Sequence, residues 1–143
     1  MSGKVLENIT YNIIKDKSLK GECYFEEGKY AEAIGQYQEA LSIVPDPKTE
    51  WEAAKWLYTA IGDSFFALKN YEYALKNFYD ASYCVEGDKN PFINLRIGQC
   101  LFEMKDNEKA DDYFLKAYLF DGLKIFKNER KKYLSYLQKK YDL

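Results

Sequence analysis

The side chains that most often carry out covalent catalysis are sparse in this sequence. Its 143 residues include no histidine and only three scattered cysteines, Cys23, Cys84 and Cys100. The lack of histidine excludes Ser-His-Asp and Cys-His nucleophilic sites and His-containing metal sites. Scattered cysteines favour a reducing compartment over a disulfide framework. We therefore expect no catalytic residue, metal or cofactor, and predict that the chain is not an enzyme.

Neighbouring acids also fail to suggest a catalytic pair. Glu26 precedes Glu27, and Asp111 precedes Asp112. Adjacent residues on a helix point about 100° apart, so their carboxylates do not converge on one substrate.

Aromatic and acidic side chains point to binding instead. Phenylalanine recurs at positions 25, 66 and 102, with acids close by in the sequence. Aromatic side chains exposed on a concave surface are typical anchors of protein interfaces, and flanking acids favour a basic partner. The candidate partner-binding residues are Phe25, Phe66, Phe102, Trp56, Phe92, Glu22, Asp63, Gln99, Glu26, Glu103 and Arg96.

An internal repeat determines how these residues are placed. Gly21, Gly62 and Gly98 each begin the same pattern. An aromatic or leucine follows three residues later, alanines follow at twelve and nineteen, and an aromatic at sixteen. The shared positions hold Tyr24, Phe65, Leu101; Ala33, Ala74, Ala110; Tyr37, Phe78, Phe114; and Ala40, Ala81, Ala117. Glycine and alanine let two helix backbones approach closely while the aromatic fills the adjacent space.

The same register predicts the helices. Gly, Asn, Asp and Pro clusters separate them. We expect helices near 6–27, 30–44, 48–68, 71–85, 91–104, 107–126 and 129–140. The small residues two after each glycine are predicted to be inert core positions, occupied by Cys23, Ser64 and Cys100.

The pattern resembles the tetratricopeptide repeat, most completely in LKGECYFEEGKYAEAIGQYQEALSIVP. The resemblance implies an all-α fold with three helix-turn-helix repeats in a right-handed superhelical stack. We assign one domain, 1–143, with repeats at about 14–45, 55–86 and 91–122. The second and third repeats depart from the pattern where Lys69 and Lys105 replace the usual loop glycine, and Glu86 and Gly122 the closing proline.

Both ends of the stack need a terminating surface. Lys17 and Lys20 occupy positions of the first repeat that normally pack inward, so this repeat is predicted to be the N-terminal cap. The last expected helix, 129–140, carries an apolar stripe. This stripe predicts a C-terminal capping helix, with a detached partner-binding helix as the alternative. Its residues are Tyr133, Leu134, Tyr136 and Leu137.

Helical geometry places the candidate binding residues in a groove. Residues six before and one, four or five after each glycine lie on one side of the first helix of a repeat, away from the core. These positions predict an aromatic ladder flanked by carboxylates. The alternative is that the aromatics pack against neighbouring helices and a C-terminal helix folded into the groove.

Charge and hydropathy limit the partners. The net charge is −2, but residues 123–143 carry +5, so residues 1–122 carry −7. An acidic body is a poor general nucleic-acid binder. Apolar runs are too short to cross a membrane, and the first residues lack the apolar core of a signal peptide. We expect a cytoplasmic protein with a protein partner and without nucleic acid, membrane or small-molecule substrate.

One use of this repeat is disfavoured by the residues. Repeats that grip the acidic C-terminus of cytosolic chaperones have a clamp of Lys, Asn and Arg. Only Arg96 matches that clamp, and Glu22 would repel a ligand carboxylate. The corresponding positions are Ser18, Glu22, Ala60, Phe92 and Arg96.

Residues 45–81 and 90–122 carry a narrower resemblance, to small bacterial three-repeat proteins encoded beside polymorphic toxins. It implies an immunity protein that binds and neutralises a basic contact-dependent or Rhs-type toxin domain. The alternatives are a cytosolic secretion chaperone and an assembly scaffold, either of which would hold an extended peptide in the groove.

Overall fold

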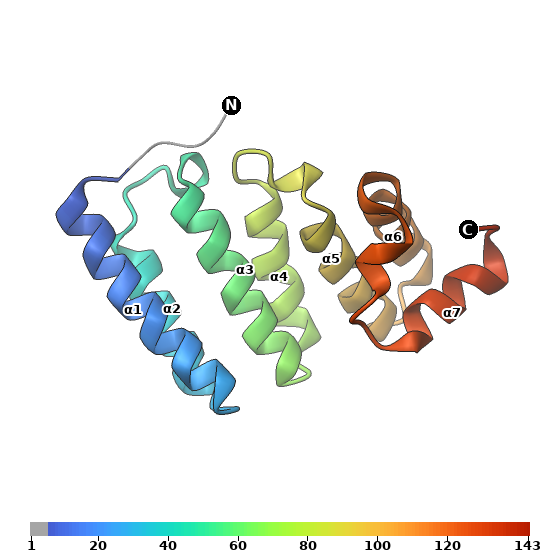
Figure 1. Cartoon of the computed structure of the whole chain (residues 1–143), viewed down its shortest axis with the longest axis horizontal. Helices are drawn as coiled ribbons and strands as arrows, with labels where there is room; N and C mark the ends of the chain where they lie inside the picture. The colour runs from blue at the N-terminus through green and yellow to red at the C-terminus, as the bar shows by residue number, and fades with distance from the viewer. Residues whose placement is uncertain (1–5) are drawn as a thin grey trace.

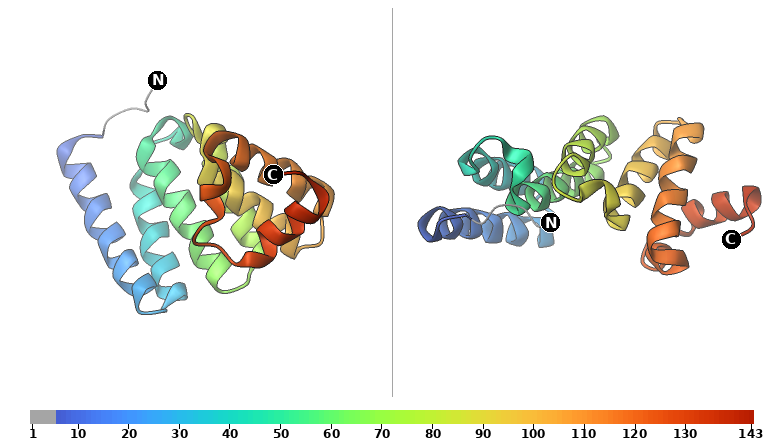
Figure 2. Two further views of the ribbon diagram at one scale, coloured as in Figure 1. Left: turned by 45° about the vertical axis from the view of Figure 1, so that its right-hand side comes forward. Right: turned by 90° about the horizontal axis from the view of Figure 1, so that it is seen from above.

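The helices pack in consecutive antiparallel pairs in the computed structural model, which describes residues 6–143. The pairs follow one another along the molecule from α1 to α7 (Figure 1). Figure 2 shows the same row from two further sides. The elements are α1 (Asn8–Glu26), α2 (Tyr30–Ile43), η1 (Lys48–Glu50), α3 (Glu52–Ala67), α4 (Tyr71–Ser82), η2 (Gly87–Lys89), α5 (Pro91–Glu103), α6 (Asn107–Asp121), η3 (Gly122–Phe126) and α7 (Lys131–Lys140). The predicted all-α fold is therefore confirmed.

The signature glycines lie where two helices of a pair come closest. A Cβ atom added to Gly62 would lie 2.6 Å from Phe78, and one added to Gly98 would lie 2.8 Å from Phe114. Such contacts are too short for any side chain, so these positions require glycine. The alanines twelve and nineteen residues after each glycine are all completely buried. The register of the repeat thus corresponds to the packing of each pair.

The turn within each pair uses one backbone conformation. Gly28, Lys69 and Lys105 each stand seven residues after a signature glycine, and all have positive φ values, of 76°, 60° and 64°. Lysine rarely adopts this left-handed conformation, which costs about 1–2 kcal/mol for a residue with a side chain. Lys69 and Lys105 therefore keep the same turn conformation as Gly28, but the backbone there is strained.

Two of the expected helices are interrupted. The range 48–68 begins as the short 3-10 helix η1, and Trp51 is extended (φ −111°, ψ 130°) before α3 starts at Glu52. The range 107–126 ends as an α-helix at Asp121, because Gly122 has a φ of 70°. The remaining boundaries lie close to those expected. Asn90 caps α5 as its pattern with Pro91 predicts, since its side chain accepts a hydrogen bond from the Ile93 amide at 3.1 Å.

The C-terminal helix packs on the third repeat. Tyr133 and Leu137 are buried, with 3% and 0% of their surface exposed, in a core that includes Phe114 and Phe126. Leu134 and Tyr136 of the same stripe are partly buried against it. The stripe therefore forms a capping helix, and the alternative of a detached helix does not describe this structure.

One of the small core positions differs from its prediction. Ser64 and Cys100 are completely buried, but Cys23 is exposed. This position faces the preceding repeat, and the first repeat has none before it in the described part of the chain. Cys23 is therefore not a core residue.

Candidate protein-binding groove

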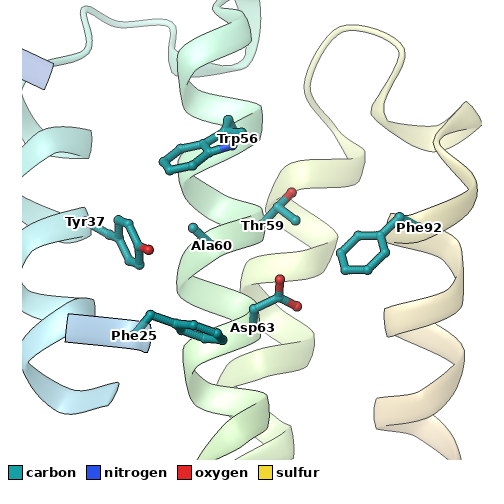
Figure 3. Close-up of a pocket in the computed structure, with 7 residues that line it drawn as sticks. All are labelled: Phe25, Tyr37, Trp56, Thr59, Ala60, Asp63 and Phe92. Atoms are coloured by element: carbon teal, nitrogen blue, oxygen red, sulfur yellow. The ribbon is translucent and has the colours of Figure 1, made fainter. Parts of the chain in front are cut away.

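A pocket opens on the groove between the first helices of the repeats. It has a volume of about 360 Å³, and we call it the central pocket. Its rings come from four helices: α1, α2, α3 and α5 (Figure 3). The lining residues are Phe25, Tyr37, Trp56, Thr59, Ala60, Asp63 and Phe92. The structure thus brings together four of the predicted residues, Phe25, Trp56, Asp63 and Phe92.

The rings of the central pocket differ in exposure, since Tyr37 is buried and Trp56 is not. Trp56 is 46% exposed, and its ring meets the Tyr37 ring edge-on with centroids 5.8 Å apart. In Figure 3, Phe25 and Tyr37 stand on one side of the pocket and Phe92 on the other, with the Asp63 carboxylate between Phe25 and Phe92. The pocket therefore combines large apolar surfaces with one acidic group.

Three carboxylates give the groove a negative potential around Tyr37. Burial raises the pKa of the Tyr37 hydroxyl to about 12, and the charges of Glu22, Asp63 and Glu26 add to the effect. Glu22 and Glu26 themselves are exposed at the edge of the groove. The hydroxyl stays protonated at neutral pH, so Tyr37 is a neutral hydrogen-bonding group.

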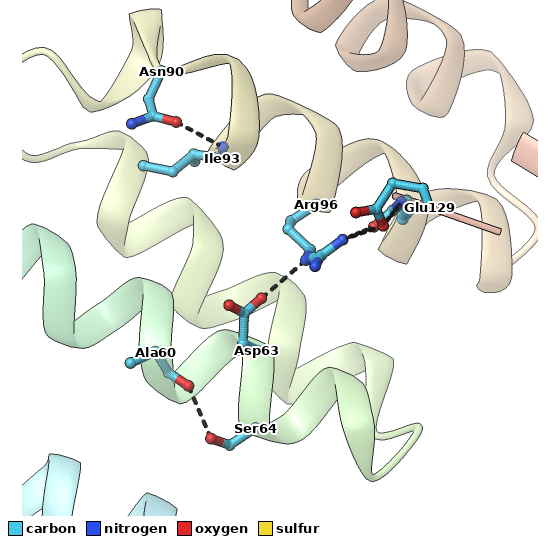
Figure 4. A network of polar contacts seen from close by, with 8 residues as sticks. Ala60, Asp63, Ser64, Asn90, Ile93, Arg96 and Glu129 are labelled. Carbon is cyan, nitrogen blue, oxygen red and sulfur yellow. Dashed lines mark hydrogen bonds and ion pairs between the residues drawn. The ribbon is translucent and has the colours of Figure 1, made fainter. Parts of the chain in front are cut away.

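Arg96 holds a cluster of polar side chains beside the central pocket (Figure 4). Its Nε donates to Asp63 Oδ1 at 2.9 Å, and its NH1 group donates to Glu129 Oε1 at 2.6 Å and to Gln99 Oε1 at 2.7 Å. Gln99 Nε2 also donates to Glu129 Oε1, at 2.8 Å. We call these four residues the Arg96 cluster. With one cation and two carboxylates, its formal charge is −1.

Aromatic rings and burial complete the environment of Arg96. Its guanidinium lies 4.5 Å from the Phe92 ring centroid and 5.3 Å from that of Phe66. Burial raises the pKa of the Asp63 carboxyl, and the adjacent guanidinium opposes that rise. Because Arg96 already binds two carboxylates, it offers little free positive charge to a ligand.

The third repeat differs from the predicted ladder. The Phe102 ring is covered by Tyr133 and Tyr136 of α7, with centroids 5.5 and 5.0 Å away. Glu103 forms an ion pair with Lys132, and Gln99 is completely buried in the Arg96 cluster. We call residues 128–141 the C-terminal segment. Phe102, Glu103 and Gln99 therefore face this segment and not an open groove.

The turn residues explain why only the third phenylalanine packs against α7. Phe25 and Phe66 pack edge-on against Tyr30 and Tyr71, with centroids 5.1 and 5.3 Å apart. Each tyrosine stands nine residues after its glycine, where the third repeat has Asn107. The tyrosines of α7 take the place of the turn tyrosine that the third repeat lacks, beside the Phe114 ring of its own repeat. These phenylalanines thus pack against rings of neighbouring helices, as the alternative to an open aromatic ladder describes.

Several residues of the groove were not anticipated. Tyr37 is a core residue, as its place in the repeat predicts, but it also lines the central pocket. It carries a hydroxyl where the other two repeats have Phe78 and Phe114. Glu129 is one of two acids in the otherwise basic range 123–143. Both departures were visible in the sequence, but the approach of Glu129 to Arg96 joins residues 33 positions apart and follows only from tertiary packing.

Burial keeps two of the three cysteine thiols protonated. Burial raises the pKa of Cys84 to about 11, and Cys100 is shifted further in the same direction. Residues 6–143 contain no group of three or more His, Cys, Asp or Glu side chains arranged to hold a metal ion. Within that range, no helix combines the length and apolar character needed to cross a membrane.

Comparison with known proteins identifies the repeats. Family models described as tetratricopeptide repeat match residues 17–47 and 93–121. These ranges correspond to the first and third repeats, and the second has the same glycine–aromatic contact in the structure. A search of curated proteins gave no match.

Solved structures show the same fold at low sequence identity. The first TPR domain of Spaghetti (RPAP3), bound to the HSP90 peptide SRMEEVD, is 22% identical and covers 89% of this chain and 97% of that one, with a TM-score of 0.69. The Sgt2 TPR domain from Aspergillus fumigatus is 20% identical and covers 88% and 80%, with a TM-score of 0.69. The first TPR domain of human RPAP3 is 22% identical and covers 90% and 98%, with a TM-score of 0.68. The chain thus contains tetratricopeptide repeats and has the fold of a TPR domain.

Proposed function

We propose that this chain is a protein-binding module that holds an extended segment of a partner protein against the central pocket. The single observation that carries the proposal is the pocket itself. Rings from four helices, of which Trp56 is 46% exposed and Tyr37 is buried, surround one carboxylate. Large aromatic side chains in such a setting are typical anchors of a bound protein chain.

The extent of the groove supports a ligand that lies along the first two repeats and reaches only the start of α5. The C-terminal segment covers Phe102 and binds Arg96 through Glu129. A partner chain would therefore run along α1 and α3 and end near Phe92. A secretion chaperone or an assembly scaffold would use the groove in this way.

The charge of the groove favours a basic partner over an acidic one. The RPAP3 domain was solved with the acidic peptide SRMEEVD. In this chain, Glu22 stands at the edge of the groove and Arg96 already binds Asp63 and Glu129. A bound acidic peptide would meet these carboxylates without a free cation to offset them.

The role of an immunity protein is a narrower form of the same proposal. A basic toxin domain fits the charge of the groove, but so does any basic partner. The three structures compared above are described as TPR domains and not as immunity proteins. The proposal is therefore limited to binding of a basic protein segment.

Selection of binding peptides tests the proposal. The full-length chain is immobilised and screened against a phage-displayed library of random peptides, and the selected peptides are synthesised and titrated by calorimetry. Trp56→Ala should weaken their binding about thirtyfold, since removing a central aromatic anchor typically costs about 2 kcal/mol. The matched control is Tyr83→Ala, which removes a ring that is 68% exposed outside the pocket. Failure to select peptides, or equal binding by Trp56→Ala, would reject the groove as a binding site.

A further inference from the structure

We propose that the central pocket receives a single cationic side chain, Lys or Arg, of the bound segment, with its charge at Asp63 and its methylene chain between the Trp56 and Phe92 rings. This inference rests on the proposed function and adds the chemistry of the ligand. It concerns the open half of the groove, because the C-terminal segment covers the other half.

The first argument is the position of Asp63 in the pocket. Its side chain is 26% exposed, and it is the one acid among the seven lining residues. Arg96 binds Oδ1, which leaves Oδ2 to accept a hydrogen bond from a ligand. Because Arg96 is shared between Asp63 and Glu129, a neutral ligand would bury this carboxylate further without balancing the net charge of −1, which is costly. A cation would compensate it.

The second argument is the surrounding aromatic surface. Phe25, Tyr37, Trp56 and Phe92 present rings to the pocket from different helices (Figure 3). Ring faces attract cations, and the effect is stronger where water is excluded. Lys and Arg also bury their methylene chains against apolar surfaces while the charged end reaches a polar group. The pocket matches both parts of such a side chain.

The third argument is an interaction already present in the molecule. The Arg96 guanidinium lies on the Phe92 ring and donates to Asp63. The same ring and carboxylate therefore already hold one cation, and both also line the central pocket. Repulsion between Arg96 and an incoming cation is offset, because the Arg96 cluster carries a formal charge of −1 with Glu129 included.

The electrostatic surroundings disfavour the opposite ligand charge. Glu22 and Glu26 lie close enough to Tyr37 to raise the pKa of its hydroxyl, together with Asp63. An anionic side chain in the pocket would face all three carboxylates. An incoming cation would be attracted by the same groups, most strongly at low salt.

The test uses the peptides selected on the full-length chain. We expect them to share a Lys or Arg flanked by apolar residues. Replacing that Lys with norleucine, which has a similar shape and no charge, should weaken binding to the wild-type chain about tenfold or more. Asp63→Asn should lose a similar factor, and the neutral peptide should bind this variant and the wild type equally. Asp112→Asn, an exposed acid on α6, is the matched control and should change nothing.

The outcomes separate the two proposals. If the selected peptides lose affinity in Trp56→Ala but bind equally well after the Lys-to-norleucine change, the cation inference is wrong and the groove remains a binding site. If no peptide depends on Trp56, both proposals fall. Because the norleucine comparison uses the unaltered protein, it decides the question even if Asp63→Asn fails to fold.

Discussion

The first two repeats and the third repeat carry the same pattern but present different surfaces. Phe25 and Trp56 line an open pocket, whereas Phe102 lies beneath the rings of Tyr133 and Tyr136. The end of a repeat stack exposes an apolar flank, which the next element along the chain covers. The difference shows that a position in a repeat has no fixed role. Its role depends on which neighbour follows.

The charges divide in the same way. In the first repeat, Glu22 and Glu26 are exposed at the groove edge. In the third, Glu103 pairs with Lys132 of the C-terminal segment. Part of the basic C-terminal charge therefore balances acids of the third repeat, and the acids of the first repeat stay available. Four experiments test this difference between the open and the covered part of the groove.

The largest effect is expected from removing the contact that closes the third repeat. Leu137→Ala should lower the free energy of unfolding by about 2–5 kcal/mol, because Leu137 is completely buried and its loss would leave a cavity. Chemical denaturation measures the change. Gln138→Ala, at the exposed neighbouring position, is the control. An unchanged midpoint for Leu137→Ala would show that α7 is not part of the cooperative core.

A smaller loss should follow from crowding the packing shared by all three repeats. Gly62→Ala should cost about 1–3 kcal/mol, since its Cβ atom would lie 2.6 Å from Phe78. Gly35 provides a matched control, because a Cβ atom there meets nothing within 4 Å. Gly35→Ala should stabilise α2 by up to about 1 kcal/mol. Equal effects of the two substitutions would contradict the assigned register.

The polar contact between α6 and the C-terminal segment should depend on pH. Asp111 accepts hydrogen bonds from Tyr136 at 2.7 Å and Tyr141 at 3.0 Å, and it also binds Lys140. Burial acts to raise the pKa of Asp111, but these hydrogen bonds outweigh it and hold the pKa below its usual value. Asp111→Asn should therefore cost about 1–2 kcal/mol at neutral pH.

The sign of that pH dependence follows from the lowered pKa. The stabilisation by Asp111 is present above the pKa of the unfolded chain, about 3.9, and is lost as the pH falls through the lower folded value. The difference in unfolding free energy between wild type and Asp111→Asn should shrink below about pH 4. Asp112→Asn, on the exposed side of α6, should show no such trend. A constant difference down to low pH would mean that the ionised carboxylate does not fasten the segment.

The smallest effect on stability is expected in the open half of the groove. Trp56→Ala should change the free energy of unfolding by no more than about 1 kcal/mol, because the side chain is half exposed and has one edge-on ring partner, Tyr37. Phe102→Ala, measured in parallel by thermal melting, should cost more because three rings surround Phe102. The reverse order would remove the distinction between open and covered halves.

Periodicity and turn residues were sufficient to predict the helices, their pairing and the register of the repeat. Gly62 with Phe78 and Gly98 with Phe114 meet in the structure at the spacing that predicts their contact. These relations are local: helical periodicity and a short turn set them within one pair. The strained turn at Lys69 and the interruption at Trp51 also arise locally. Neither can be predicted from the residue type, because lysine rarely adopts a positive φ and tryptophan does not usually end a helix.

Which of the predicted binding residues are open to solvent depends on tertiary packing. The sequence places Phe25, Phe66 and Phe102 at equivalent positions, and nothing in their spacing shows that α7 covers the last. That covering depends on contacts between residues about thirty positions apart, such as Glu129 with Arg96 and Tyr136 with Phe102. Their formation reflects the shape and charge of the exposed end of the stack. Such long-range contacts depend on the packing of the whole chain, because helical periodicity constrains only neighbouring turns.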